Sequence, residues 1–246
     1  MEKEKKVIIA LYGDPNTGKT TTLRKLALEV LKSSEVEGDI QVGFLYYKKN
    51  KKNPTKILVS TAEDPRANVA FYTGLMAQTL ILATTRIKDQ TGEINVVAEL
   101  VRKGDADPGQ EEIDNGLEQE IKKLISSIAQ KGTATLPQFL LRLLQSEVVE
   151  GDIQIAFRYK GQKIVVSTAG DTKEVVEESI ALFKVVDADV LVTATRDTET
   201  RAYGALRNYE KGIKAMAIWM PKSGREATNE RQVETLRSFI DLLSNS

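Results

Sequence analysis

A short segment near the start of the chain combines the residue types that bind phosphate groups. It contains two glycines five positions apart, followed directly by a lysine and a threonine: Gly13-Asp14-Pro15-Asn16-Thr17-Gly18-Lys19-Thr20. The glycines let successive backbone amides turn towards one anion, and the lysine adds a positive charge. The threonine hydroxyl is an oxygen ligand of the kind that Mg²⁺ prefers. The pattern therefore predicts a site for a phosphorylated ligand and its metal ion.

The segments on either side of this loop are of the types that would position it. Residues 5–12 (KKVIIALY) are short, apolar and rich in β-branched residues, as expected for a buried parallel strand. Residues 20–32 (TTTLRKLALEVLK) repeat apolar residues at helical spacing, which predicts a helix with one buried face. A helix that starts at the loop adds its free amides and its partial positive charge to the same anion site.

Strand, loop and helix together resemble the P-loop NTPase superfamily, with a complete Walker A motif within residues 5–32. The resemblance implies that Lys19 contacts the β- and γ-phosphates of a nucleoside triphosphate and that Thr20 ligates Mg²⁺. The expected nucleotide-binding residues are Gly13, Asp14, Pro15, Asn16, Thr17, Gly18, Lys19, Thr20 and Thr21. The loop itself resembles translation-factor-type GTPases, whereas GKTTTLRKLA resembles signal-recognition GTPases and partition-type ATPases. The subfamily therefore stays open.

Several segments of the chain recur in the same order, which indicates an internal duplication. Residues 38–41 and 151–154 both read GDIQ, and ILVSTA at 57–62 corresponds to IVVSTA at 164–169. Each copy predicts an antiparallel hairpin followed by a helix and a further strand. Strands that alternate with helices predict a mostly parallel sheet. We expect an α/β fold, a three-layer sandwich of P-loop NTPase type with antiparallel hairpins.

The duplication divides the chain into two expected halves. Residues 1–87 form the nucleotide-binding half, residues 113–246 form the homologous second half, and residues 88–112 are a linker or a lid. At the place of the phosphate loop the second half reads SSIAQKGT (126–133), where the lysine precedes a single glycine. The second copy has therefore lost its phosphate loop, and we expect one nucleotide site per chain.

Hydrolysis of a triphosphate needs a carboxylate near the Mg²⁺ ion and a group that positions the attacking water. In P-loop relatives this carboxylate ends the strand that follows, but here KILVST (56–61) ends in Ser60 and Thr61. The first carboxylates beyond it are Glu63 and Asp64. We expect Asp64 to serve the metal ion or the water, with Glu63 as the next candidate. The alternative is that Asp64 caps the helix that follows.

Two arginines end equivalent strands of the two halves, at the edge where α/β sheets face their ligands. Arg86 ends TLILATTR and Arg196 ends DVLVTATR. Each is a candidate arginine finger for the γ-phosphate, and a surface ion pair is the alternative for each. Asp197 alone matches the N-K-x-D motif with which GTPases read guanine. We therefore expect ATP ahead of GTP.

The composition limits the chemistry and the partners. The chain has no cysteine and no histidine, which excludes thiolate and imidazole catalysis. Lys+Arg and Asp+Glu both total 35, so nothing calls for a polyanionic partner. The lysine-rich segment 46–56 is interpreted as a solvated hairpin tip, and we expect no nucleic-acid partner. Without a signal-type or membrane-spanning segment, we expect a cytoplasmic protein that has no membrane association.

These observations predict Mg²⁺-dependent binding and hydrolysis of a nucleoside triphosphate, coupled to a conformational change. The expected catalytic residues are Lys19, Asp64, Arg86 and Arg196, and the expected metal-binding residues are Thr20 and Asp64. A small-molecule kinase is the alternative enzyme. A nucleotide-sensing scaffold with negligible turnover is the alternative without catalysis, because the strand-end carboxylate is missing. A protein partner or a homodimer stays open.

Overall fold

A computed structural model of the 246-residue chain describes most of the sequence. The described residues are 6–46, 55–60, 79–87, 94–102, 119, 122–123, 126–127, 136–146, 149–222 and 226–244. The chain divides into two compact units, one formed by Met1–Gly38 with Asp152–Ser246 and the other by Asp39–Gly151. The first unit thus joins both ends of the chain, and its boundaries differ from those of the halves expected from the duplication.

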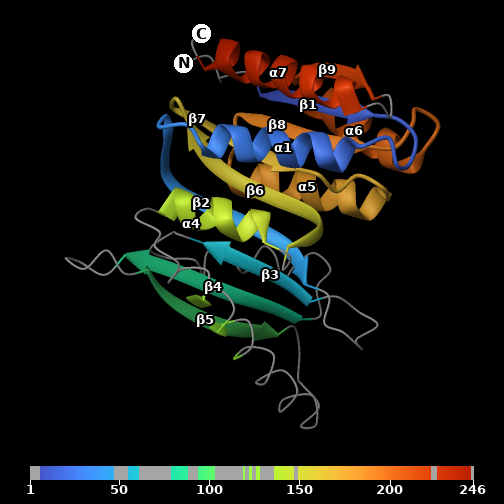
Figure 1. Cartoon of the computed structure of the whole chain (residues 1–246). Coiled ribbons are helices and arrows are strands. Elements are labelled where there is room, and N and C mark those ends of the chain that lie inside the picture. The colour runs from blue at the N-terminus through green and yellow to red at the C-terminus, as the bar shows by residue number, and fades with distance from the viewer. Residues whose placement is uncertain are drawn as a thin grey trace. The chain divides into compact units, whose positions relative to one another are not determined.

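The first unit alternates strands and helices along most of its length (Figure 1). Its elements are β1 (Val7–Tyr12), α1 (Lys19–Leu31), β6 (Glu150–Tyr159, which starts at the unit boundary), β7 (Gln162–Ser167), α5 (Lys173–Val185), β8 (Val190–Thr195), α6 (Arg201–Ile213), β9 (Met216–Pro221) and α7 (Glu226–Leu243). The predicted strand and helix on either side of the glycine-rich loop are therefore confirmed as β1 and α1.

The sheet of the first unit has β1 among its inner strands. Its strand order is β6-β7-β8-β1-β9, and Val7–Leu11 of β1 are buried. Strands β7, β8, β1 and β9 run parallel, and β6 runs antiparallel to β7. In this register Tyr12 lies beside Thr195 of β8 and Pro221 of β9. The carboxyl ends of the parallel strands therefore meet at one edge, where open α/β sheets bind their ligands.

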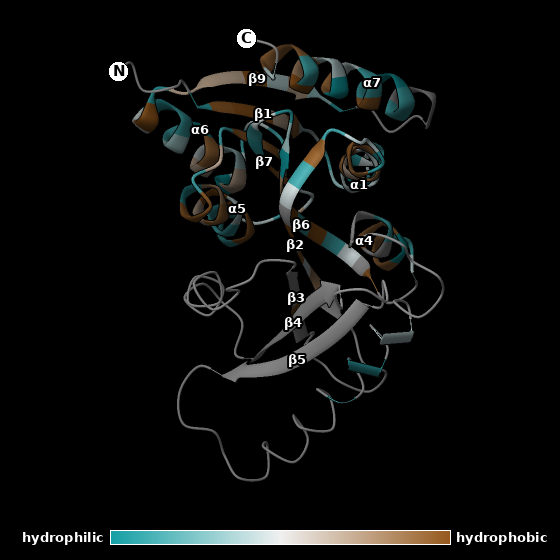
Figure 2. Cartoon of the chain, turned by 90° about the vertical axis from the view of Figure 1, so that its left-hand side faces the viewer, coloured by the Kyte–Doolittle hydropathy of each residue, from teal (hydrophilic) through white to brown (hydrophobic). Residues whose placement is uncertain are grey.

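Helices cover both faces of this sheet. Figure 2 shows α1 and α7 on one face and α5 and α6 on the other. Both pairs bury apolar side chains, such as Leu23 and Leu26 of α1 and Val176 and Phe183 of α5. This layering confirms the expected α/β class, with strands of mixed direction in the sheet.

The second unit contains most of β2 (Val36–Tyr46, which crosses the unit boundary after Gly38), β3 (Thr55–Ser60), β4 (Thr79–Ile87), β5 (Ile94–Arg102) and α4 (Leu136–Gln145). Strand β3 pairs antiparallel with β2 and parallel with β4, and β5 pairs antiparallel with β4. The two predicted hairpins, β2 with β3 and β6 with β7, are therefore confirmed. Their registers correspond, because Gln41 lies opposite Ser60 and Gln154 lies opposite Ser167. The duplication itself stays a prediction.

Two hydrogen bonds join α7 to the end of β6. The hydroxyl of the buried Tyr159 donates a hydrogen bond to Oδ1 of Asp241 at 2.8 Å, and the Lys160 ammonium donates to the same atom at 2.6 Å. Partial burial raises the pKa of Asp241, but these two hydrogen bonds and the positive charges of Lys160 and Arg237 together hold the pKa below its ordinary value. A carboxylate with a lowered pKa in the folded state stabilises the fold when it is ionised.

We therefore expect Asp241→Ala to lower the free energy of unfolding at pH 7 by about 1–3 kcal/mol, because Tyr159 loses its acceptor. The contribution should be complete above the unfolded-state aspartate pKa of about 3.9 and should disappear as the pH falls through the lower folded-state pKa. Urea unfolding of both proteins between pH 7 and pH 3 measures this. Parallel stability curves for wild type and variant would show that Asp241 is not the source of the pH dependence.

Candidate phosphate-binding site

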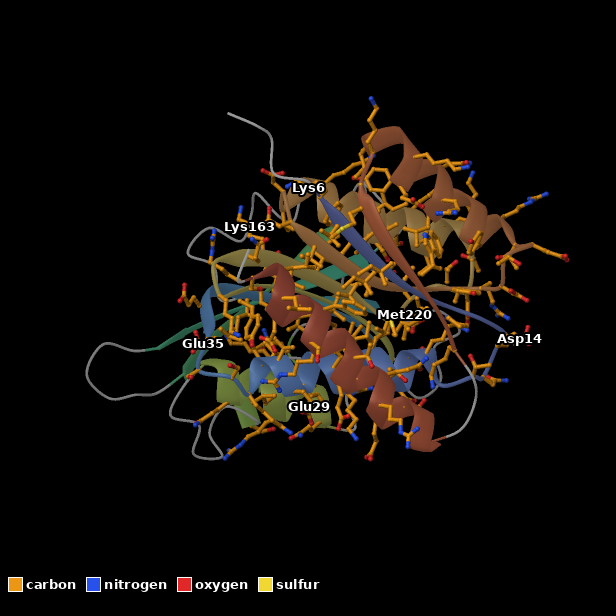
Figure 3. The ribbon with its side chains drawn as sticks, turned by 90° about the horizontal axis from the view of Figure 1, so that it is seen from above. Lys6, Asp14, Glu29, Glu35, Lys163 and Met220 are labelled. Atoms are coloured by element: carbon orange, nitrogen blue, oxygen red, sulfur yellow. The ribbon has the colours of Figure 1, made fainter. Side chains whose placement is uncertain are left out.

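The glycine-rich loop connects the carboxyl end of β1 to the start of α1, at the ligand-facing edge of the sheet. Figure 3 shows Asp14 of the loop at the opposite end of the first unit from Lys6 and Lys163. Gly13 has φ +149° and Gly18 has φ +80°, values in the region that favours glycine. Gly18 is also the N-cap residue of α1. The loop therefore has the tight curvature that its two glycines predict.

Lys19 directs its charge into this loop. Its ammonium donates hydrogen bonds to the carbonyl oxygens of Gly13 at 2.8 Å and Asp14 at 2.7 Å, and the residue is 6% exposed. Burial lowers the pKa of Lys19, whereas the nearby Asp171 carboxylate raises it. A buried cation held by loop carbonyl oxygens, at a helix N-terminus, suits an anionic ligand that brings several oxygen atoms.

Thr20 shares a carboxylate partner with a residue that follows β7. Its hydroxyl donates a hydrogen bond to Oδ1 of Asp152 at 3.2 Å, and the Thr168 hydroxyl donates to the same oxygen at 2.9 Å. Asp152 reaches this position because β6 runs antiparallel to β7, so the beginning of β6 lies beside the end of β7. The amide of Ile153 donates a hydrogen bond to the Thr168 hydroxyl at 2.9 Å, which fixes the start of β6 beside the end of β7.

This group of oxygen atoms fits a magnesium ion. Mg²⁺ is usually held by one or two carboxylates together with hydroxyl, water and phosphate oxygens. Thr20 and Asp152 supply a hydroxyl and a carboxylate beside the loop, so Thr20, the metal ligand predicted from the sequence, has a carboxylate neighbour in Asp152. No group of three or more acidic side chains that could hold a metal ion by itself occurs among the residues that the structure describes.

A pair of oppositely charged residues lies at the neighbouring strand ends. Nε of Arg196, directly after β8, forms an ion pair with Oδ1 of Asp171, after β7, at 2.9 Å. Both charges act on the Lys19 ammonium, Asp171 favouring its charged form and Arg196 opposing it. Gly170 allows the loop after β7 to approach the end of β8, since a Cβ there would clash with the Ala194 carbonyl oxygen. The lysine, the arginine and the carboxylate therefore belong to one electrostatic group.

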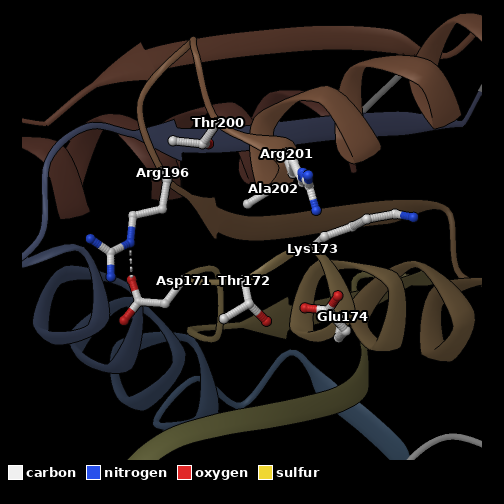
Figure 4. Close-up of a pocket in the computed structure, with 8 residues that line it drawn as sticks. All are labelled: Asp171, Thr172, Lys173, Glu174, Arg196, Thr200, Arg201 and Ala202. Carbon is white, nitrogen blue, oxygen red and sulfur yellow. Dashed lines mark ion pairs between the residues drawn. The ribbon is translucent and has the colours of Figure 1, made fainter.

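Asp171 and Arg196 also line a surface hollow of about 370 Å³ (Figure 4). The figure shows two sets of side chains that face each other across it, one from the loop before α5 and the first residues of α5, and the other from the loop before α6 and the first residues of α6. The lining residues are Asp171, Thr172, Lys173, Glu174, Arg196, Thr200, Arg201 and Ala202. The hollow is lined by both positive and negative side chains. Two of them, Asp171 and Arg196, are the charged residues that affect the pKa of Lys19.

The residues predicted from the sequence fall into three groups. All of Gly13–Thr21 lie in the loop and the first turn of α1, and Arg196 belongs to the same unit. Arg86 lies on β4 of the second unit, opposite Asn95, so its role as an arginine finger stays a prediction. Asp64 and Glu63 lie outside the described residues. For Arg196 the structure shows the ion pair that was the alternative to a finger.

Sequence reasoning missed Asp152 and Asp171 as site residues. Asp152 is part of the repeated GDIQ segment, and Asp171 follows the repeated STA segment as STAGD. The signal was therefore present, but the carboxylate was expected after the strand KILVST (56–61) of the first copy. The neighbours of β1 in space are β8 and β9, from the other end of the chain.

No family model, curated protein or solved structure matches this chain. Within the part of the chain that the structure describes, none of the helices is long and apolar enough to cross a membrane. The function is therefore inferred from the chemistry of the loop and of the strand ends around it.

Proposed function

We propose that the chain is a P-loop NTPase that binds a nucleoside triphosphate with Mg²⁺ at Gly13–Thr21 and hydrolyses it, with ATP as the expected nucleotide and GTP as the second. The observation that carries this proposal is the placement of Lys19. Its buried ammonium is held by two loop carbonyl oxygens at the end of a buried strand, with a helix N-terminus beside it. This is the combination of charge and amides that binds the β- and γ-phosphates in P-loop proteins.

In this proposal Thr20 and Asp152 hold the metal ion. Bound Mg²⁺ neutralises charge on the phosphates and so favours attack by water. The Thr20 hydroxyl and the Asp152 carboxylate are already in contact at 3.2 Å, which supports a shared role. Thr168 hydrogen-bonds to the same carboxylate oxygen and keeps it turned towards Thr20. Asp152 thus takes the metal role that the sequence assigned to Asp64.

Arg196, oriented by Asp171, would act on the terminal phosphate. The Arg196 guanidinium balances the charge that develops on the phosphoryl oxygens, and Asp171 orients the guanidinium through the 2.9 Å ion pair. Asp152, Asp171 and Arg196 all come from the expected second half of a duplicated chain. The second half therefore completes the site although its own copy of the phosphate loop is lost.

The experiment incubates the purified chain with ATP or GTP, each with and without Mg²⁺, and measures inorganic phosphate and transfer to added acceptors. We expect Mg²⁺-dependent release of inorganic phosphate, faster with ATP than with GTP. Phosphate that appears on an acceptor instead would identify the small-molecule kinase. Tight binding without turnover would identify the nucleotide-sensing scaffold, and no binding of either nucleotide would contradict the proposal.

A further inference from the structure

A polar side chain of the last helix contacts the phosphate loop from the side of α7. Oδ1 of Asn229 accepts a hydrogen bond from the Thr22 hydroxyl at 3.1 Å and another from the Lys222 ammonium. Thr22 is fully buried and Lys222 is 6% exposed. The Thr22 hydroxyl also lies 2.9 Å from the carbonyl oxygen of Gly18, the residue that starts α1. Asn229 is therefore joined to the loop through buried groups.

Each glycine of the loop lies against one of these two residues, Lys222 or Asn229. A Cβ at Gly18 would lie 3.2 Å from Nδ2 and 3.4 Å from Oδ1 of Asn229. A Cβ at Gly13 would lie 3.0 Å from the carbonyl oxygen of Lys222, whose own amide donates to the Tyr12 carbonyl oxygen at 2.9 Å. Lys222 and Asn229 thus lie against the two glycines of the loop, Lys222 against Gly13 and Asn229 against Gly18.

We propose that Asn229 is a positioning residue of the phosphate loop. It ties Lys222, which lies against Gly13, to Thr22 and Gly18, and so fixes the two ends of the loop relative to each other. Loop amides that are held in place before a ligand arrives lose less conformational freedom on binding, which strengthens binding. The effect on nucleotide affinity rests on the proposed function, whereas the effect on the loop itself does not.

Charge adds to the role of this contact. Burial lowers the pKa of Lys222, and the neighbouring Lys19 ammonium lowers it further. Two ammonium groups near one loop repel each other, and an anionic ligand relieves that repulsion. By holding the Lys222 ammonium with its amide oxygen, Asn229 keeps the second positive charge beside the loop.

The test of the loop uses hydrogen exchange of the backbone amides of residues 13–22 without any nucleotide. Asn229→Ala should speed exchange of these amides by about tenfold, because two hydrogen bonds to a buried network are lost. The amides of α5 should not change. Asn229→Asp keeps an oxygen acceptor for Thr22 and Lys222, so its loop exchange should stay close to that of the wild type.

The matched control is the next residue on the same helix. Glu230 is 68% exposed and forms a surface ion pair with Lys25 of α1 at 2.8 Å, so Glu230→Gln loosens a contact between α7 and α1 away from the loop. We expect it to leave loop exchange unchanged. Unchanged exchange in Asn229→Ala, or an equal increase in Glu230→Gln, would overturn the positioning role.

Titration with ATP and Mg²⁺ supplies the second measurement. If the wild type binds ATP, Asn229→Ala should bind it about tenfold more weakly, which corresponds to about 1.4 kcal/mol. Equal affinity of wild type and variant would overturn the claim that Asn229 prepares the loop for its ligand. If the wild type binds no nucleotide, the proposed function fails, and hydrogen exchange still decides whether Asn229 positions the loop.

Discussion

Lys19→Met should abolish detectable hydrolysis of ATP and weaken ATP binding by about 100-fold. In the proposed function the ammonium gives charged hydrogen bonds to the phosphates, and such bonds are worth about 1.5–3 kcal/mol each. A donor that acts on charge developing in the transition state contributes a further factor of about 10²–10³ in rate. Calorimetric titration with ATP and a phosphate-release assay measure the two effects. Methionine keeps the length and the apolar stem of lysine, so the packing of α1 is preserved.

The unfolding temperature of Lys19→Met shows whether weaker ATP binding comes from the missing ammonium or from an unfolded protein. Burial lowers the pKa of Lys19, which shows that the site disfavours an isolated positive charge. We therefore expect Lys19→Met to unfold at the same temperature as the wild type or at a higher one. Lys25→Met is the matched control, because Lys25 lies on the same helix and pairs with Glu230 at the surface. Equal ATP affinity in wild type and Lys19→Met would show that Lys19 does not bind the nucleotide.

Asp152→Asn should remove most of the effect of Mg²⁺ on ATP binding and lower the hydrolysis rate by about 100-fold. The amide oxygen still accepts the hydrogen bonds of Thr20 and Thr168, so the corner between β6 and β7 is preserved. The negative charge that attracts the metal ion is lost, and hydrolysis depends on metal charge beside the phosphates. Titrations with ATP in Mg²⁺ and in EDTA should differ for the wild type and nearly coincide for the variant.

Asp187→Asn is the control for this change. Asp187 is 82% exposed, pairs with Lys6 at 2.9 Å and has φ +47°, a conformation that asparagine tolerates. Lys6 lies at the opposite end of the unit from Asp14 of the loop (Figure 3). The control should therefore bind and hydrolyse ATP like the wild type. A full Mg²⁺ effect in Asp152→Asn would show that another residue supplies the carboxylate, with Asp64 as the first candidate.

Local patterns predicted the elements that surround the loop. The apolar run before Gly13 and the helical spacing after Gly18 depend on neighbouring residues, and both elements form where the sequence places them. The hairpin of β6 and β7 was predictable for the same reason, since its strands are separated by a short turn. Short-range signals of this kind need no knowledge of how distant segments pair.

The composition of the site depended on pairing between distant segments. Parallel strands can be far apart in sequence, and β1 lies between β8 and β9, which follow it by more than 180 residues. The sequence named Arg196 as a candidate for the γ-phosphate, but it did not show that Lys222 lies against Gly13. Asp152 was missed because its position depends on the antiparallel direction of β6 beside the end of β7. Asp64 was predicted because Glu63 and Asp64 are the first carboxylates after the strand KILVST (56–61).

The most direct test of the central claim is an amide NMR titration of the ¹⁵N-labelled chain with ATP and Mg²⁺. If Gly13–Thr20 holds the phosphates, the amide resonances of Thr17, Gly18, Lys19 and Thr20 should shift most and should saturate together, and Lys19→Met should show no shift at the same concentrations. Resonances that shift elsewhere while these four stay unchanged would contradict the claim that this loop binds the nucleotide.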